Sequence, residues 1–161
     1  MTMSSLAELR ERLQAIEDER AVERLIASYG PLVDAGEADA TAQLWALDGT
    51  YHVEGWHMHS RDDVAAMVRS DAHQGLINHG CSHFLGPAVV TIDGDDAVAV
   101  CESVLLLRRN GAYIAARAGA NHFRLRRIDG RWQIVARTTH ALDGSDEPRA
   151  LLSDGVSGTA R

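Results

Sequence analysis

The residues of this chain best suited to chemistry are Asp34 and His83. A carboxylate and an imidazole have ordinary pKa values on either side of neutrality, so together they can accept, hold and return a proton. Each also has a plain structural interpretation, Asp34 as a solvated residue at a helix end and His83 as a strand-edge histidine bonded to backbone. A helix dipole opposes an anion at its C-terminal end, so a carboxylate placed there after Leu32 and Val33 suggests a use.

Tyr29 precedes Asp34 by five residues and could add a phenol hydroxyl to the pair. In an ideal helix, side chains five positions apart point about 140° apart, so these two would not share a face. Gly30-Pro31 lies between them, and a proline within a helix removes a backbone donor and clashes with the preceding turn. We therefore expect the helix to unwind locally there, which would let both side chains reach one cavity. The alternative is that Tyr29 is part of the helix core.

Five further residues are candidates for contact with a substrate. Glu102 interrupts an otherwise apolar predicted strand, and if buried it would need a partner and would form a second acid–base candidate. The alternative is that Glu102 points to solvent on the outer face of a sheet. The other four are expected to line a cavity or pack in the core: Tyr51, Trp56, Asn121 and Phe123.

Two pairs of histidines have spacings found in metal sites, His79 with His83 and His57 with His59. Gly80 argues against a helix through the first pair, and no nearby cysteine or carboxylate completes either set. We therefore expect no metal site and no organic cofactor.

The composition limits the possible classes of function. The chain has 161 residues, 45% of them apolar, and a formal net charge of −7, which predicts one globular domain that binds neither nucleic acid nor an anionic membrane. Every basic residue is arginine, which excludes Schiff-base chemistry on lysine and a P-loop ATPase. Two cysteines make no disulfide framework, and a thiol nucleophile at Cys81 is a minor alternative. With no signal-peptide core and no stretch of transmembrane length, we expect a cytoplasmic protein.

Apolar periodicity and turn residues predict helices first and strands afterwards. Gly and Pro mark the breaks, and Ser60 begins a pattern typical of a capping box. We predict helices at 5–34, 39–47 and 61–73, and strands at 50–54, 83–92, 97–108, 112–128 and 131–140.

This order is an α+β pattern, in which the N-terminal helices wrap a curved antiparallel sheet into a cone with an internal apolar cavity. We expect a single domain over residues 1–140. Residues 141–161 are rich in Gly, Ser and acidic residues, so we expect a C-terminal tail that is flexible or packs at a dimer interface.

The order of elements and several short stretches resemble the SnoaL-like branch of the nuclear-transport-factor-2-like superfamily. No stretch is specific by itself, but their order and spacing are, over about residues 10–140. They are Leu25 to Gly36 around Tyr29 and Asp34, Leu44 to Tyr51, His83 ten residues before Asp93-Gly94, and Phe123 to Ile134.

Within that superfamily the chain looks most like the small cofactor-free lyases: scytalone dehydratase, bile acid 7α-dehydratase and hexachlorocyclohexane dehydrochlorinase. The resemblance implies that His83 is a base oriented by Asp34. It also implies that Tyr29 is a hydrogen-bond donor, since the dehydratases have a tyrosine there and the dehydrochlorinase a lysine. These relatives often have a tyrosine and a carboxylate or amide where this chain has Asn121 and Phe123, so the resemblance does not identify the substrate.

The resemblance therefore implies a dehydratase-type lyase acting on a small hydrophobic cyclic substrate, and a homodimer or trimer. The fold also serves double-bond isomerases of the ketosteroid isomerase type, polyketide cyclases and non-catalytic binding or subunit modules. The Asp–His–Tyr set favours an enzyme over the last of these.

Overall fold

The computed structural model describes residues 3–161, with side chains from Ser5 onward. Within that range the chain forms five helices and seven strands. The helices are α1 (Met3–Asp34), α2 (Ala38–Ala42), α3 (Arg61–Arg69), α4 (Asp71–His79) and α5 (Asp146–Val156). The strands are β1 (Trp45–Val53), β2 (Trp56–Met58), β3 (Cys81–Leu85), β4 (Val89–Asp93), β5 (Asp96–Arg109), β6 (Ala112–Ile128) and β7 (Arg131–Ala141).

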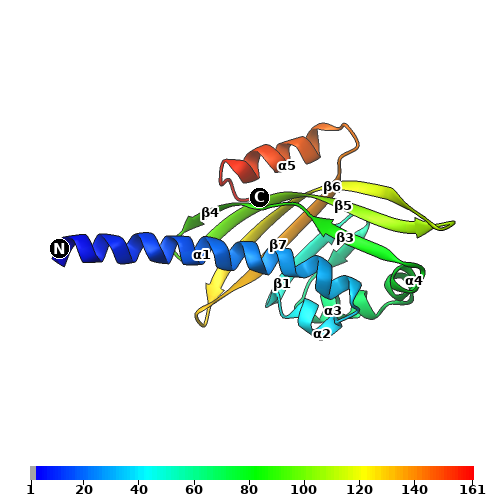
Figure 1. The fold of residues 1–161 in the computed structure, drawn as a ribbon, viewed down its shortest axis with the longest axis horizontal. Coiled ribbons are helices and arrows are strands. Elements are labelled where there is room, and N and C mark those ends of the chain that lie inside the picture. The colour runs from blue at the N-terminus through cyan, green and yellow to red at the C-terminus, as the bar shows by residue number, and fades with distance from the viewer. Residues whose placement is uncertain (1–2) are drawn as a thin grey trace.

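The strands form one curved sheet in the order β2-β1-β7-β6-β5-β3, and β4 also pairs with β5. Strands β5, β6 and β7 form an antiparallel meander, while β1 joins its edge parallel to β7. Helices α1, α2 and α3 lie against one face of the sheet and α5 lies on the other (Figure 1). The predicted α+β class, with helices over a curved sheet, is confirmed.

The core lies between α1 and the inner face of the sheet. Alternate residues of β5 and β6 point inward, as the period of a strand requires. Helix α1 presents Val22, Ile26 and Val33 to this face at helical spacing, and all three are buried. Apart from α1, the largest fully buried apolar side chains are Trp45, Phe123, Leu125 and Ile134.

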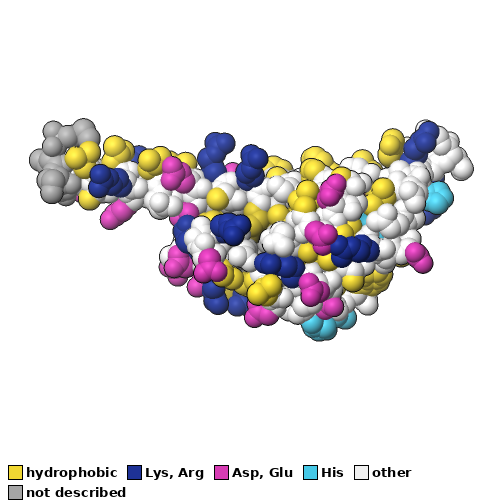
Figure 2. Space-filling model, turned by 90° about the horizontal axis from the view of Figure 1, so that it is seen from below, with side chains coloured by type: hydrophobic (Ala, Val, Ile, Leu, Met, Phe, Trp, Pro, Cys, Tyr) yellow, Lys and Arg dark blue, Asp and Glu magenta, His cyan; other side chains and the backbone are white. Residues whose placement is uncertain are grey.

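Helix α1 carries two apolar stripes with different surroundings. The second packs on the sheet, but the first is exposed where α1 projects beyond the body of the molecule, and its side chains form a row in Figure 2. Its members are Leu6, Leu9, Leu13 and Ile16, each at least 40% exposed. The change of phase between the stripes therefore marks the point where the helix leaves the domain.

Three predicted elements have different boundaries. Trp45 and Leu47 belong to β1 and not to a helix over 39–47, because α2 ends at Ala42 and the chain then pairs with β7. The helix predicted over 61–73 ends at Arg69, and the Ser70 side chain caps a separate helix, α4. The strand predicted over 83–92 is interrupted at 86–88, where Gly-Pro-Ala separates β3 from β4.

The C-terminal segment is also more regular than expected. Instead of an irregular tail, residues 146–156 form α5, which packs on the outer face of the sheet. Gly155 makes this close approach possible, because a Cβ there would lie 2.4 Å from Val100 Cβ. Packing at a dimer interface, and the dimer or trimer itself, stay predictions. Among the described residues, no helix has the length and apolarity needed to cross a membrane.

A partly buried ion pair joins α1 to the end of β6. Asp18 accepts hydrogen bonds from both terminal nitrogens of Arg127, at 2.8 and 2.7 Å, and from Trp132 Nε1 at 3.3 Å. The bond from Arg127 outweighs burial and lowers the pKa of Asp18 from 3.8 to about 2.

We expect Asp18→Asn to destabilise the fold by about 2 kcal/mol at pH 7. The pKa of Asp18 is lowered in the folded state, so its stabilisation is present above about pH 3.8 and is lost as the pH falls towards 2. Urea unfolding of both proteins at a series of pH values measures the difference, which should shrink below pH 4. The control is Asp95→Asn, which removes the exposed partner of Arg127 and should cost less than about 1 kcal/mol. A difference that does not change with pH would contradict this account.

Candidate active site

The last residue of α1 holds a histidine of β3 in place. His83 Nδ1 lies 2.6 Å from Asp34 Oδ1, and the backbone N–H of His83 donates to Asp34 Oδ2 at 2.7 Å. The carboxylate therefore binds both the ring and the main chain of the same residue. This arrangement puts the proton of the neutral ring on Nδ1 and leaves Nε2 with a free lone pair. The predicted contact between Asp34 and His83 is present.

The carboxylate of Asp34 is ionised at neutral pH. Partial burial raises its pKa, but hydrogen bonds from the ring and backbone of His83 lower it more, and the net pKa lies below the ordinary value. An anion next to Nδ1 favours the imidazolium that would form if Nε2 took a proton. The pair is therefore suited to act as a base with a fixed orientation.

Gly30 allows α1 to approach β3 closely enough for this contact. A Cβ on Gly30 would lie 2.2 Å from the carbonyl oxygen of His83, so only glycine fits. The predicted unwinding at Gly30-Pro31 is wrong, because α1 continues through Pro31 to Asp34. The proline is tolerated within the last turn of the helix. The glycine beside it does not break the helix but lets α1 pack closely against β3.

His83 lies in the wall of a cavity of about 370 Å³. Tyr29, Tyr51 and Trp56 line the same cavity, so four of the predicted residues meet there, and Asp34 lies behind His83. The Tyr29 ring meets the His83 ring edge-on at 6.3 Å between centres. The rest of the lining is mainly apolar: Val53, Met67, Ala72, Leu76 and Leu105, with His73, Glu54 and Arg117.

Arg137 of β7 places a buried positive charge behind two of the cavity tyrosines. Its guanidinium carbon lies 4.1 Å from the ring centre of Tyr29 and 4.5 Å from that of Tyr51. Nη2 donates to Asn121 Oδ1 at 2.8 Å, but Nε and Nη1 have no hydrogen-bond partner among the described residues. An arginine cannot become neutral by losing a proton, so burying this charge costs free energy. That cost points to a functional role for Arg137.

A bulge in β7 explains why strand periodicity did not reveal Arg137. In the pairing with β6, Leu125 faces Ile134 and Arg124 faces Ala136, so Val135 is an extra residue. One extra residue exchanges the two faces of a strand. Arg137 thereby turns inward at a position that strict alternation would place outside.

His73 of α4 is a second cavity residue that the sequence patterns missed, because the helix containing it was not separated from α3. It is buried, and its Nε2 bonds the carbonyl oxygen of Val33 at 3.0 Å. Burial lowers the pKa of His73, so this ring is neutral at neutral pH. Its centre lies 5.5 Å from that of His83, which places a second imidazole beside the proposed base.

The remaining candidates lie outside the cavity lining. Asn121 is fully buried, and its amide bonds Cys101 O, Ser103 Oγ, Thr139 Oγ1 and Arg137, so no polar atom is left for a substrate. Phe123 is buried against the guanidinium of Arg137. Glu102 is exposed on the outer face of β5, next to the inward-facing Cys101, so it is not a second acid–base group at this site.

Contrary to the expectation from sequence that no cysteine or carboxylate completes a donor set at His83, the sulfur of Cys81 and ligand atoms of Asp34 and His83 lie within 4.8 Å of one another. Burial, followed by the nearby Asp34, raises the pKa of Cys81 to about 11. At neutral pH the residue is therefore a thiol, which is neither the nucleophile nor the metal ligand that a thiolate would be. Its sulfur lies 3.5 Å from Asp34 Oδ1, as a weak donor to the same carboxylate.

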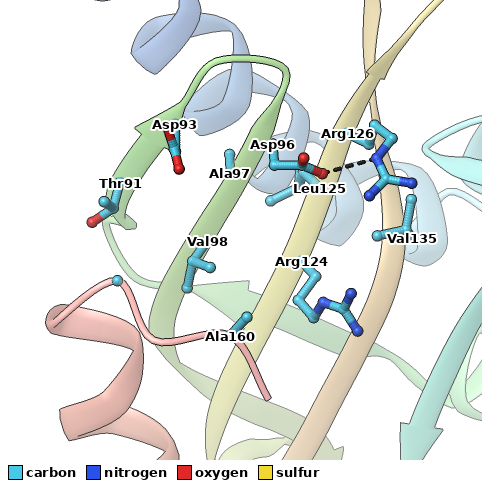
Figure 3. Close-up of a pocket in the computed structure, with 11 residues that line it drawn as sticks. Thr91, Asp93, Asp96, Ala97, Val98, Arg124, Leu125, Arg126, Val135 and Ala160 are labelled. Atoms are coloured by element: carbon cyan, nitrogen blue, oxygen red, sulfur yellow. Dashed lines mark hydrogen bonds and ion pairs between the residues drawn. The ribbon is translucent and has the colours of Figure 1, made fainter.

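A second hollow, of about 310 Å³, lies on the outer face of the sheet beneath the C-terminal segment (Figure 3). Charged side chains surround it, and an ion pair between Arg126 and Asp96 crosses one side. It contains neither histidine nor cysteine, and the sheet separates it from His83. The inner cavity is therefore the better candidate for a reaction.

Residues 14–138 match the SnoaL-like domain family. The chain belongs to that family. The curated proteins gave no match.

Solved structures agree with this SnoaL-like assignment. An NTF2-like protein of cystatin-like fold from Novosphingobium aromaticivorans has 42% sequence identity and a TM-score of 0.90, over 94% of this chain and 99% of its own. Two others share the fold at lower identity. A protein of unknown function from Mycobacterium tuberculosis has 21% identity and a TM-score of 0.72, over 92% and 91% of the two chains. A proposed scytalone dehydratase from N. aromaticivorans has 16% identity and a TM-score of 0.66, over 79% and 85%.

In this SnoaL-like domain we expect Gly30→Ala to lower the free energy of unfolding by about 1–3 kcal/mol, because the new methyl group would force α1 away from β3. The same shift should lengthen the contact between Asp34 and His83. Chemical denaturation measures the first effect. The control is Gly75→Ala in α4, where a Cβ meets nothing within 4 Å and the change should be neutral or stabilising by up to about 1 kcal/mol. Equal effects at both positions would show that Gly30 has no special packing role.

Proposed function

We propose that this SnoaL-like domain is a cofactor-free lyase that removes water from a small hydrophobic cyclic substrate. The observation that carries the proposal is an ionised Asp34 bound to Nδ1 of His83 at the wall of a mainly apolar cavity. A base with a fixed tautomer beside an apolar cavity suits abstraction of a proton from carbon. We place the protein in the cytoplasm, as a homodimer or trimer, as part of the same proposal.

In the proposed reaction His83 Nε2 takes a proton from the carbon next to a substrate carbonyl. The electrons of the broken C–H bond pass to the carbonyl oxygen as an enolate. When the enolate collapses, a C=C bond forms and the C–O bond to the adjacent hydroxyl breaks. The hydroxyl leaves as water with the proton that His83 returns. Asp34 stabilises the imidazolium between these two transfers.

Tyr29 is proposed to donate its phenol hydrogen to the enolate oxygen or to the leaving hydroxyl. Burial, with a smaller contribution from Tyr51, raises the pKa of Tyr29 well above its usual range, so the phenol keeps its proton. Arg137 opposes that rise, and its charge behind the ring makes the hydroxyl a stronger donor. A donor fixed in this way acts where negative charge develops.

The second candidate is a double-bond isomerase or a cyclase that uses the same residues. A single base can return its proton to another carbon without expelling a group, and His73 beside His83 supplies a further imidazole for such a transfer. The products separate the two functions. A panel of cyclic β-hydroxy ketones, analysed by mass spectrometry, should show loss of one water. Products that all keep the mass of the substrate would favour the isomerase, and the absence of turnover on the whole panel would favour a non-catalytic binding module.

We expect His83→Ala to lower turnover by about 10² or more, because it removes the base. Asp34→Asn should also be damaging, since an amide can accept a hydrogen bond but cannot stabilise an imidazolium by charge. Tyr29→Phe keeps the ring and tests the hydroxyl alone. Turnover per folded molecule is measured beside the melting temperature of each variant, because Asp34→Asn also weakens the contact between α1 and β3. Lost stability with unchanged turnover per folded molecule would make these residues structural.

A further inference from the structure

Three histidines gather on the β1–β2 hairpin, away from the candidate active site. His52 and His57 are direct partners across the hairpin, and their ring centres lie 4.8 Å apart. The ring centre of His59 lies 6.1 Å from that of His52. Histidine side chains form a patch at one edge of the molecule in Figure 2. His52 is half-buried and the other two are exposed, so solvent reaches the cluster.

Among the residues that the structure describes, these three are also the histidines whose rings make no hydrogen bond or ion pair. Four of the other five have a ring nitrogen hydrogen-bonded to a protein atom: His73 to Val33, His79 to Gly75, His83 to Asp34 and His122 to Thr159. The fifth, His140, has Nε2 3.6 Å from Oε1 of Glu147, as an ion-pair contact. Among the described residues, the ring nitrogens of His52, His57 and His59 have no such bond. Clustered imidazoles whose nitrogen lone pairs accept no hydrogen bond can coordinate a metal ion.

The ring centres of these histidines lie near the separations that one metal ion requires, but their ligand nitrogens do not yet converge. Among the described residues, three ligand atoms lie within 4.8 Å of one another only in the set formed by Asp34, Cys81 and His83. With Zn–N distances of about 2.0–2.1 Å, two imidazoles on a tetrahedral ion have ring centres about 5 Å apart. The pair formed by His52 and His57 already has this separation. His59 must come about 1 Å closer to His52. Because the His52 ring meets the other two rings edge to face, the exposed side chains of His57 and His59 must also turn to aim their nitrogens at one ion. A water completes four-fold coordination, and neutral imidazole selects zinc, nickel or copper over calcium or magnesium.

We propose that His52, His57 and His59 form a surface site for a borderline transition-metal ion, with zinc as the ordinary occupant. The ion would tie β2 to β1. Trp56, adjacent to His57, lines the inner cavity, so the ion would also stiffen one rim of that cavity. The sequence shows only the pair His57 and His59, and the hairpin pairing supplies the third ligand.

The test uses tag-free, chelator-treated protein and zinc or copper ions. Equilibrium dialysis should find one zinc per chain, and the melting temperature should rise with zinc. Each of His52→Gln, His57→Gln and His59→Gln should weaken binding by at least about tenfold and abolish the shift in melting temperature. Because the residues are at the surface, the variants should melt like the wild type without metal. Paramagnetic resonance of the copper-loaded wild type should show three imidazole nitrogens, and this readout needs no variant.

Two controls locate the ion. His79→Gln removes a histidine on α4 that is already bonded to backbone, and Cys81→Ser removes the thiol of the other donor set. Both should bind zinc like the wild type. The proposal is overturned if the wild type binds no zinc, if His59→Gln binds as tightly as the wild type, or if Cys81→Ser abolishes binding while the hairpin variants retain it.

Discussion

The contact between the end of α1 and the start of β3 governs the site. One carboxylate, that of Asp34, bonds both the ring and the main chain of His83, so the orientation of the ring and the position of the strand are set together. The contact exists because Gly30 has no side chain where α1 crosses the carbonyl oxygen of His83. Changes in the packing of α1 are therefore transmitted directly to the candidate base.

The charge of Arg137 is the second constraint. Among the described residues the buried guanidinium of Arg137 has no carboxylate partner, which costs free energy. The aromatic rings of Tyr29, Tyr51 and Phe123 offset part of that cost. Asn121 uses its whole amide to hold this arginine and its own neighbours in place. A buried charge that lowers the stability of the fold and lies beside an apolar cavity is typical of a functional site, where the charge serves the chemistry.

Sequence patterns predicted the class of fold and the chemical pair, but not the whole site. The periodicity of α1 and the turns of the meander depend on local apolar spacing, which one sequence contains. Tyr29, Tyr51, Trp56 and His83 meet in one cavity as expected. The sequence patterns missed Arg137 because a bulge, one extra residue in β7, exchanges the two faces of the strand. Amino-acid composition gives no signal for such a bulge.

Other misses have the same origin in long-range contacts. Whether Glu102 faces inward depends on the register of β5, and Gly30-Pro31 suggested a break because the strand that Gly30 contacts is distant in sequence. The stretch 141–161 is polar in composition, yet it folds because the outer face of the sheet supplies a partner for α5. Local patterns therefore identified the reactive residue types, while tertiary register decided which of them meet.

The protonation of the His83 ring tests the central claim most directly. Long-range proton–nitrogen NMR on labelled protein reports which ring nitrogen carries hydrogen, and it needs no substrate. The account predicts that the neutral ring carries its proton on Nδ1 and keeps a free lone pair on Nε2, and that Asp34→Asn loses this fixed pattern. A proton on Nε2, or a pattern that Asp34→Asn leaves unchanged, would contradict the claim that Asp34 holds His83 as an oriented base.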